Sequence, residues 1–219
     1  KLAIQDYIRP GAHAHLVGIG GVSMEPLAEV LHREGVVVTG SDLHESAGVA
    51  RLRALGIPVT IGHLPASVAG AGCVARTAAA HDDNPEIAAA RAAGIPVFER
   101  AQAWGAIMRR YPNALCVAGT HGKTTTTSMC TQIFLAAGRD PSVMIGGTLP
   151  ALGAGHRVGG GDTIILESCE YCNSFLSFFP TVAVILNVDA DHLDFFKDLE
   201  DIKSSFRRFA ELVPETGFV

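Results

Sequence analysis

The chain has 219 residues, of which 48% are hydrophobic and 18% charged, and its formal net charge is −5. This length is enough for one large or two ordinary domains with a sizeable core. The sequence contains neither a basic run nor an apolar run approaching about 20 residues, so we expect no nucleic-acid partner and no membrane span. The cysteines number 5, and no secretory leader is seen, which together predict reduced thiols and a cytoplasmic location.

Strand-like and helical segments alternate along the first half, which predicts a parallel α/β sheet. Asn84 before Pro85 predicts a helix that Asn84 caps and Pro85 begins. Trp104 and Met108 lie one helical turn apart and predict a buried helix face. The expected strands are residues 14–19, 36–39, 59–61, 73–75 and, at an edge, 95–98. The expected helices are residues 22–34, 47–55, 85–94 and 100–111.

A glycine-rich turn follows the first expected strand. Gly18-Ile19-Gly20-Gly21-Val22-Ser23 nearly matches the dinucleotide-binding fingerprint, with Ser23 in place of the third glycine, and Asp42 stands about 20 residues further on. Glycines at a helix N-terminus let backbone N–H groups approach a diphosphate closely. A UDP-sugar satisfies this loop as well as NAD does, so a nicotinamide-dependent dehydrogenase remains one interpretation.

In the second half, the continuous apolar run at residues 182–186 predicts a buried central strand. The glycine-rich residues 153–161 are expected to form a mobile loop. The other expected strands are residues 114–118, 143–145 and 163–166, and the expected helices are residues 125–137 and 199–212.

The most informative stretch is Gly119-Thr120-His121-Gly122-Lys123-Thr124-Thr125, which lies between an expected strand and an expected helix. This order is typical of a loop that holds a nucleotide triphosphate, with Lys123 at the β- and γ-phosphates and the Thr124 hydroxyl on Mg²⁺. The spacing of its glycines is shorter than in the standard motif, and the alternative is an ordinary turn with a surface lysine. We expect a domain boundary at Pro112–Asn113, which gives a Rossmann-like domain over residues 1–111 and a P-loop α/β domain over 112–219.

Acidic side chains follow two other expected strands, at the edge where parallel α/β sheets bind their ligands. Glu167 ends one strand, and His192 lies among Asp189, Asp191 and Asp194 after the other. A carboxylate beside a phosphate loop is a candidate Mg²⁺ ligand. His192 is either a metal ligand or a solvated loop residue.

These motifs resemble the Mur ligases. The resemblance rests on the phosphate loop, on Glu167 and on Asn187-x-x-x-Asp191-His192-Leu193-Asp194. The start of the chain, His15 to Met24, together with Gly40-Ser41-Asp42 and Asp83-Asn84-Pro85-Glu86, is similar to the type that joins L-alanine to UDP-N-acetylmuramate.

The resemblance implies an ATP-dependent amide ligase of peptidoglycan precursor synthesis. The muramoyl carboxylate attacks the γ-phosphate of ATP, and the amine of L-alanine then displaces phosphate. Lys123, Glu167 and His192 are the implied catalytic residues, and Thr124, Glu167 and His192 are the implied Mg²⁺ ligands. The implied ATP-binding residues are Gly119, Thr120, His121, Gly122, Lys123, Thr124 and Thr125. The candidate UDP-sugar-binding residues are Gly18, Gly20, Gly21, Val22, Ser23, Met24, Asp42 and Thr77.

The chain also departs from the family pattern. Cys169 and Cys172 stand where aspartates are common, and their C-x-x-C spacing leaves a metal or redox role open. Several members of the family carry a modified lysine beyond the His-Leu-Asp sequence, and Phe206 and Arg207 stand near that place here, which favours the alanine-adding type. Both ends look cut and a third domain is missing, so we expect that this piece alone cannot complete ligation. A ligase that reattaches recycled tripeptide and a homologue that only binds UDP-sugar remain alternatives.

Two sets of side chains are assigned no chemical role. The first set is expected on helix surfaces or loops and comprises His32, His44, His63 and His156. The second set is expected to pack in the core or between domains and comprises Phe175, Phe178, Phe179, Phe195 and Phe196.

Overall fold

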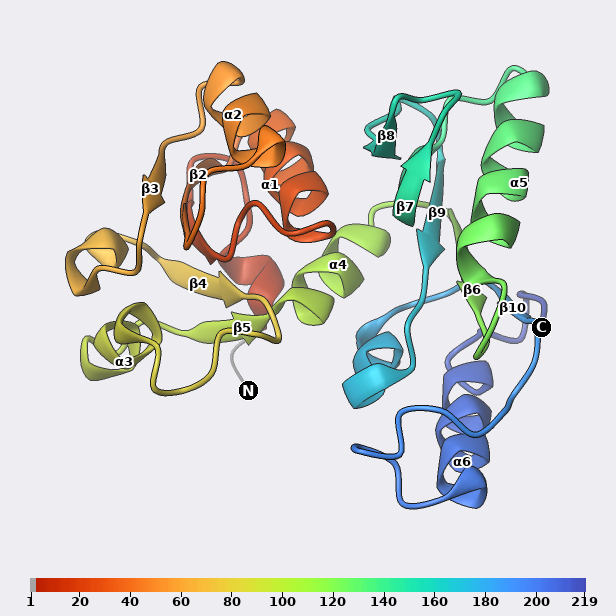
Figure 1. Cartoon of the computed structure of the whole chain (residues 1–219). Helices are drawn as coiled ribbons and strands as arrows, with labels where there is room; N and C mark the ends of the chain where they lie inside the picture. The colour runs from red at the N-terminus through yellow and green to blue at the C-terminus, as the bar shows by residue number, and fades with distance from the viewer. Residues whose placement is uncertain (1–2) are drawn as a thin grey trace. The chain divides into compact units, whose positions relative to one another are not determined.

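The computed structural model describes residues 3–219 and divides into two compact units. The first unit ends at Ala103, and the second runs from Trp104 to Val219. Each unit has its own five-stranded sheet with helices packed on it, which confirms the predicted α/β class (Figure 1). No described helix is both long and apolar enough to cross a membrane.

The first unit is built on a parallel sheet in the order β3-β2-β1-β4-β5. This order places β1 at the centre, so that the turn after β1 lies at the middle of the ligand-binding edge. Its strands are β1 (His13–Val17), β2 (Val37–Asp42), β3 (Val59–Ile61), β4 (Cys73–Arg76) and β5 (Val97–Glu99). Its helices are α1 (Met24–Arg33), α2 (Ala47–Ala54), α3 (Pro85–Ala92) and the short η1 (Ile4–Asp6) and η2 (Pro65–Val68).

Helix α3 begins as the sequence predicts. The Asn84 side-chain oxygen accepts hydrogen bonds from the backbone N–H groups of Glu86, at 2.9 Å, and Ile87, at 3.4 Å. Pro85 occupies the first helical position, where its missing N–H leaves no bond unmade. This cap fixes Glu86 in the first turn of α3, where its side chain is fully buried.

The second unit has a mixed sheet in the order β10-β6-β9-β7-β8. Its strands are β6 (Asn113–Ala118), β7 (Ser142–Leu149), β8 (Ala154–Arg157), β9 (Thr163–Glu167) and β10 (Val182–Ile185). Its helical segments are α5 (Lys123–Ala136), η3 (Tyr171–Ser177) and α6 (Leu199–Ala210), and α4 (Arg100–Met108) spans the division between the units.

The glycine-rich residues 153–161 do not form a simple mobile loop, so that prediction is wrong. They contain β8, which pairs antiparallel with β7 through Met144–His156 and Leu149–Ala154. A Cβ at Gly155 would lie 2.8 Å from the Gly147 carbonyl oxygen, so a glycine is needed where these strands approach. This hairpin also makes the sheet mixed rather than wholly parallel.

The apolar run at residues 182–186 is an edge strand and not the predicted central one. Within the named strands of the described chain, β10 pairs only with β6. Its outer side bonds instead to a single later residue, because Ala183 N–H donates to Phe218 at 2.9 Å and Phe218 N–H donates to Thr181 at 3.1 Å. This extra pairing partly covers β10, which accounts for an apolar sequence at an edge.

Aromatic packing in the second unit confirms part of the core prediction. Phe175 is fully buried and stacks on Phe209 of α6 at 4.5 Å between ring centroids. Trp104 and Met108 of α4 are buried as expected. Phe179 and Phe195 are not core residues, since they are 40% and 42% exposed.

Candidate active site

The turn between β6 and α5 depends on two glycines. Gly119 has φ 139° and Gly122 has φ 85°, and side chains rarely adopt either conformation. A Cβ on Gly119 would also lie 3.1 Å from the Leu186 side chain. Gly122 caps α5, so the unpaired N–H groups of the first helical turn face the loop. The predicted phosphate loop therefore has the backbone form that anion binding requires.

Lys123 is held over this loop by its ammonium group. Its Nζ donates to the Gly119 carbonyl at 2.5 Å, to the Thr120 carbonyl at 3.2 Å and to Glu170 Oε2 at 3.1 Å. The Glu170 side chain is 2% exposed and the Lys123 side chain is 13% exposed, so both partners of this ion pair lie away from solvent. The sequence motifs assign no role to Glu170. Its spacing of three residues from Glu167 was the available signal.

Thr124 and Glu167 form the second part of the site. The Thr124 hydroxyl donates to Glu167 Oε1 at 3.1 Å, and the Gly146 N–H donates to Glu167 Oε2 at 2.7 Å. Glu167 ends β9, the strand beside β6, so the sheet brings its carboxylate to the start of α5. Residues 3–219 contain no group of three or more His, Cys, Asp or Glu side chains that could hold a metal alone. A hydroxyl and one carboxylate nevertheless suit Mg²⁺, which keeps waters and binds substrate phosphates.

His192 approaches the same carboxylate that Lys123 contacts. Its Nε2 lies 3.9 Å from Glu170 Oε1, and its ring packs on Tyr171 at 4.7 Å between centroids. The Tyr171 hydroxyl donates to Asp194 at 2.9 Å, which raises the pKa of Tyr171. The structure thus brings Lys123 and His192 together through Glu170, whereas no direct contact joins Glu167 to His192 among the described residues.

Asn187 ties the segment after β10 to the phosphate loop. Its Oδ1 accepts from His121 N–H at 2.8 Å, and its Nδ2 donates to the His121 carbonyl at 3.0 Å. Two residues after Asn187, the Asp189 N–H donates to the Thr120 hydroxyl at 2.9 Å. Thr125 is exposed in the first turn of α5. These hydrogen bonds hold the segment that carries His192 against the phosphate loop.

The first unit holds a separate cavity of about 500 Å³ at the carboxyl edge of its sheet. Gly18 has φ 76°, and a Cβ there would lie 2.5 Å from Thr77, so the two chain segments touch. Asp42 Oδ2 accepts from Gly20 N–H at 2.8 Å. The lining residues are Gly18, Gly21, Asp42, Leu43, His63, Thr77, Ala79, Ala80, His81, Asp83, Asn84 and Pro85.

Several predicted sugar-site residues do not line this cavity. Val22 is 64% exposed, Ser23 is half-buried, and Met24 is 1% exposed in the core. Met24 begins α1 with Ser23 as its N-cap, and the Met24 N–H donates to the Gly21 carbonyl at 2.9 Å. The cavity itself is formed by Gly18, Gly21, Asp42 and Thr77 from the predicted set.

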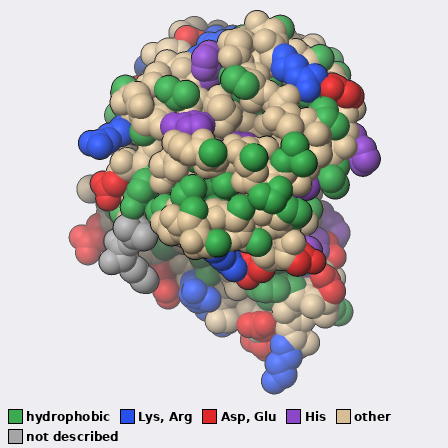
Figure 2. All heavy atoms as spheres, turned by 90° about the vertical axis from the view of Figure 1, so that its left-hand side faces the viewer, with side chains coloured by type: hydrophobic (Ala, Val, Ile, Leu, Met, Phe, Trp, Pro, Cys, Tyr) green, Lys and Arg blue, Asp and Glu red, His purple; other side chains and the backbone are tan. Residues whose placement is uncertain are grey.

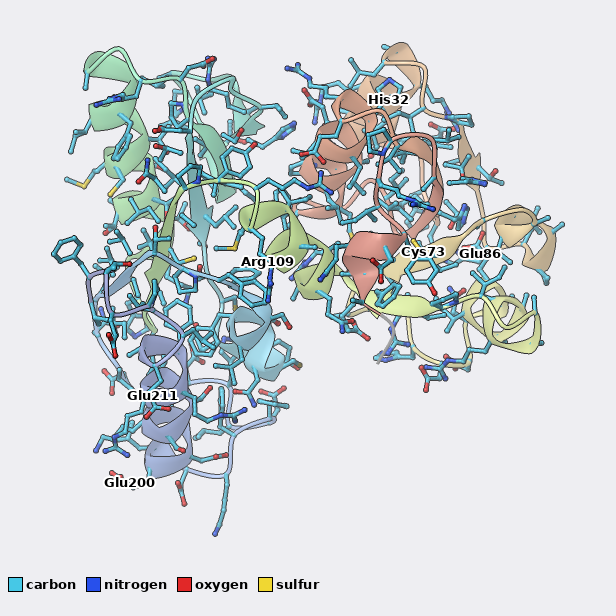
Figure 3. All side chains as sticks on the ribbon, turned by 180° about the vertical axis from the view of Figure 1, so that it is seen from behind. His32, Cys73, Glu86, Arg109, Glu200 and Glu211 are labelled. Atoms are coloured by element: carbon cyan, nitrogen blue, oxygen red, sulfur yellow. The ribbon has the colours of Figure 1, made fainter. Side chains whose placement is uncertain are left out.

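His63 was expected to have no role, yet it lines the cavity and has a buried partner. Its Nδ1 lies 3.0 Å from Glu86 Oε2 and 3.0 Å from the Ser41 hydroxyl. Burial alone raises the pKa of Glu86, but the nearby His15 ring and hydrogen bonds with Ser41 and His63 outweigh it and hold this pKa below the usual carboxyl value. The signal for His63 was its place just after the strand at 59–61, on the ligand-binding edge. Figure 3 marks Glu86 within the first unit, and Figure 2 views the unit from the side of β3, where histidine side chains reach the surface.

Comparison with known proteins decides the family. Residues 13–112 match the model of the Mur ligase family, catalytic domain, and residues 117–219 match the Mur ligase middle domain. This chain belongs to the Mur ligase family.

Named relatives of this Mur ligase chain agree with that assignment. It is 51% identical over 205 residues to UDP-N-acetylmuramate–L-alanine ligase of Caldanaerobacter subterraneus subsp. tengcongensis, covering 94% of this chain and 45% of the relative. It is 48% identical over 207 residues to the enzyme of the same name from Acetivibrio thermocellus, covering 94% and 44%. The chain therefore spans less than half the length of these curated relatives.

Solved structures give the same result for the fold of this Mur ligase chain. UDP-N-acetylmuramate-alanine ligase of Thermotoga maritima has a TM-score of 0.84 at 31% identity, covering 92% of this chain and 47% of that one. UDP-N-acetylmuramate:L-alanyl-gamma-D-glutamyl-meso-diaminopimelate ligase of Neisseria meningitides has a TM-score of 0.86 at 29% identity, covering 94% and 69%.

Proposed function

We propose that the whole protein joins L-alanine to UDP-N-acetylmuramate at the expense of ATP, and that this chain supplies the cradles for the UDP-sugar and for ATP. The names of relatives at 51% and 48% identity support this substrate pair over the tripeptide-adding alternative, whose structural representative is 29% identical. The proposal includes the cytoplasmic location expected for such an enzyme.

The second unit would bind the triphosphate of ATP. Backbone N–H groups from Gly119 to Thr125 surround the phosphates, and Lys123 exchanges its carbonyl contacts for β- and γ-phosphate oxygens. Thr124 and Glu167 would hold Mg²⁺, which neutralises phosphate charge during transfer. Asn187 keeps the loop in shape while phosphate enters and leaves.

The first unit would bind UDP-N-acetylmuramate. Its diphosphate lies against the loop from Gly18 to Gly21 and the start of α1, and Asp42 at the end of β2 lies toward the ribose. Val22 and Ser23 continue this loop into α1, and the Met24 N–H holds the turn by donating to the Gly21 carbonyl at 2.9 Å.

The proposed ligation proceeds in two steps, phosphoryl transfer and then amide formation. An oxygen of the muramoyl carboxylate forms a bond to the γ-phosphorus as the bond to the β-phosphate oxygen breaks, which gives an acyl phosphate and ADP. The amine of L-alanine next attacks the acyl carbon, phosphate leaves, and the nitrogen loses a proton. Lys123 stabilises the charge that gathers on the transferred phosphoryl group, and His192 with Glu170 borders the reacting carboxylate.

The single observation that carries this proposal is the convergence of Lys123, Thr124 and Glu167 at one helix start, with 3.1 Å between the Thr124 hydroxyl and Glu167. Calorimetric titration of ATP in the presence of Mg²⁺ tests it. We expect Lys123→Met to weaken binding on the order of a hundredfold, since it removes a charged partner of the phosphates. Lys203→Met is the matched control, because the Lys203 side chain on α6 is 40% exposed and its ion pair within residues 3–219 is with Glu200 at 2.7 Å. Equal affinities of the two variants for ATP would refute the proposal.

A further inference from the structure

Cys169 and Cys172 stand on either side of Glu170 and Tyr171, at the edge of the phosphate loop. Both cysteines carry thiols that form no disulfide within the described chain, and Cys172 is exposed while Cys169 is half-buried. A structural zinc site takes four ligands, and residues 3–219 contain no group of three or more His, Cys, Asp or Glu side chains that could hold a metal. The C-x-x-C spacing therefore has to be explained by the two thiols alone.

The backbone between the two cysteines already forms the turn that a disulfide needs. Glu170 has φ −73° and ψ −24°, and Tyr171 begins η3 with helical dihedral angles. Two consecutive helical residues place the Cα atoms on either side of them about 5–6 Å apart. Disulfides join Cα atoms that are about 4.4–6.8 Å apart, so Cys169 and Cys172 meet this condition. The Asn173 N–H holds the turn by donating to the Glu170 carbonyl at 2.8 Å.

Cys172 also has an uncommon backbone conformation. Cys172 and Asn173 have φ of 53° and 54°, in the left-handed region that residues with a side chain rarely adopt. Such conformations are costly and cluster at functional sites and switch regions. Because the Cys172 side chain is exposed, an oxidant can reach its thiol first, and Cys169 is close enough in the turn to react with the product.

The two residues between the cysteines contact the proposed ATP site. The Glu170 carboxylate accepts from Lys123 Nζ at 3.1 Å, and the Tyr171 ring packs on His192 at 4.7 Å between centroids. A bond between the two thiols closes a small ring around Glu170 and Tyr171 and restricts the conformations that both can adopt. A Glu170 carboxylate restrained in this way competes with the ATP phosphates for the Lys123 ammonium.

We propose that Cys169 and Cys172 are a reversible oxidation site, in which a disulfide forms between them and lowers the affinity of the second unit for ATP. The bridge itself does not depend on the proposed function, and only its effect on ATP rests on that function. Disulfides in a reducing compartment are mostly transient, catalytic or redox-sensing, so we expect this bridge to be reversible.

The oxidant is a low-molecular-weight disulfide, and the reaction has two exchange steps. The Cys172 thiolate attacks one sulfur of that disulfide, which forms a mixed disulfide and expels a first thiolate. Cys169 then loses its proton and attacks the Cys172 sulfur, which forms the Cys169–Cys172 bond and expels a second thiolate. The two cysteines give up two electrons and two protons, and the small disulfide takes them up as two thiols.

Oxidised glutathione tests for the bridge, with the remaining thiols counted by alkylation and mass spectrometry. We expect the treated chain to lose two alkylable thiols, to carry no glutathione at Cys172 and to recover both thiols with dithiothreitol. Cys169→Ser should instead keep one glutathione on Cys172, because the thiol needed for the second exchange is missing. Cys130→Ser removes a half-buried thiol of α5 and should form the bridge as wild type does. A wild-type chain that retains glutathione on Cys172, or that forms disulfide-linked dimers, would overturn the inference.

Calorimetric titration of ATP with Mg²⁺ into the reduced and the oxidised chain tests the effect on the site. We expect oxidation to weaken ATP binding about threefold or more in wild type and to leave the double variant C169S/C172S unchanged. Equal affinities of the reduced and the bridged wild-type chain would overturn the inferred effect of the bridge while the proposed function stands. Failure of the reduced chain to bind ATP would overturn the proposed function together with this effect, whereas the bridge is decided by the mass spectra.

Discussion

Lys123 and Glu170 form a buried ion pair at the phosphate loop, with 3.1 Å between Nζ and Oε2. The pair keeps the lysine folded onto the Gly119 carbonyl, at the place where phosphate oxygens would bind. Glu170 also lies 3.9 Å from His192, so one carboxylate connects two of the residues implied by family resemblance. The ion pair thus holds the Lys123 ammonium next to the place where the ATP phosphates are proposed to bind.

Removing the charge of Glu170 should destabilise the second unit. Glu170→Gln leaves the buried ammonium of Lys123 without its ionic partner, and we expect a loss of about 1–3 kcal/mol in the free energy of unfolding. Urea denaturation measures this loss. The matched change Glu200→Gln breaks an exposed pair with Lys203 and should alter stability by less than about 0.5 kcal/mol. Equal effects of the two substitutions would show that Glu170 is not the partner that matters.

Asn187 should matter for ATP affinity although it is expected to touch no phosphate. Asn187→Ala removes both hydrogen bonds to the His121 backbone, which frees the loop to adopt other conformations. We expect ATP to bind about tenfold more weakly, since ordering the loop then costs binding energy. Calorimetry on this variant and on Gln132→Ala, an exposed position on α5, separates a loop effect from a general one. An unchanged affinity for Asn187→Ala would mean that the loop is rigid without this clamp.

Glu86 should make stability depend on pH. Its pKa is lowered in the folded chain, because the nearby His15 ring and hydrogen bonds with Ser41 and His63 outweigh burial. A lowered carboxyl pKa contributes stability above the unfolded value of about 4.3, and this contribution is lost as the pH falls through the folded value. The difference in unfolding free energy between wild type and Glu86→Gln should therefore shrink as the pH falls below about 4.5. A difference that stays constant across that range would contradict the ionised, paired carboxylate.

The cysteines should differ sharply in reactivity. Burial raises the pKa of Cys73 and of Cys116 to about 12, so neither forms a thiolate readily. Cys172 is exposed at the start of η3. A thiol-reactive dye should label Cys172 first in the native chain, and Cys172→Ser should remove that fast phase. Rapid labelling of Cys73 or Cys116 before unfolding would show that the first or the second core opens more often than its packing implies.

Features that depend on a few neighbouring residues could be predicted from the sequence. Asn84 and Pro85 determine where α3 begins, and Gly119 and Gly122 determine the turn before α5. The structure places these features where the sequence predicts them. The boundary at Pro112–Asn113 stays a prediction.

Pairings between distant segments could not be predicted in this way. The antiparallel pairing of β8 with β7 and the edge position of β10 depend on which strands meet, and an apolar run alone does not encode that. The link from His63 to Glu86 likewise joins two segments that are separate in sequence. The position of His63 just after β3 nevertheless indicates that it lies at the ligand-binding edge of the sheet.

The central claim is that Lys123, Thr124 and Glu167 together bind ATP with Mg²⁺. Titration of ATP with Mg²⁺ and again with a chelator tests it most directly, on wild type, on Thr124→Val and on Thr126→Val, which alters a neighbouring hydroxyl on α5. The account predicts that Mg²⁺ tightens ATP binding to wild type and to Thr126→Val on the order of tenfold or more, and that Thr124→Val loses this gain. An equal gain from Mg²⁺ in Thr124→Val and in wild type would contradict the account.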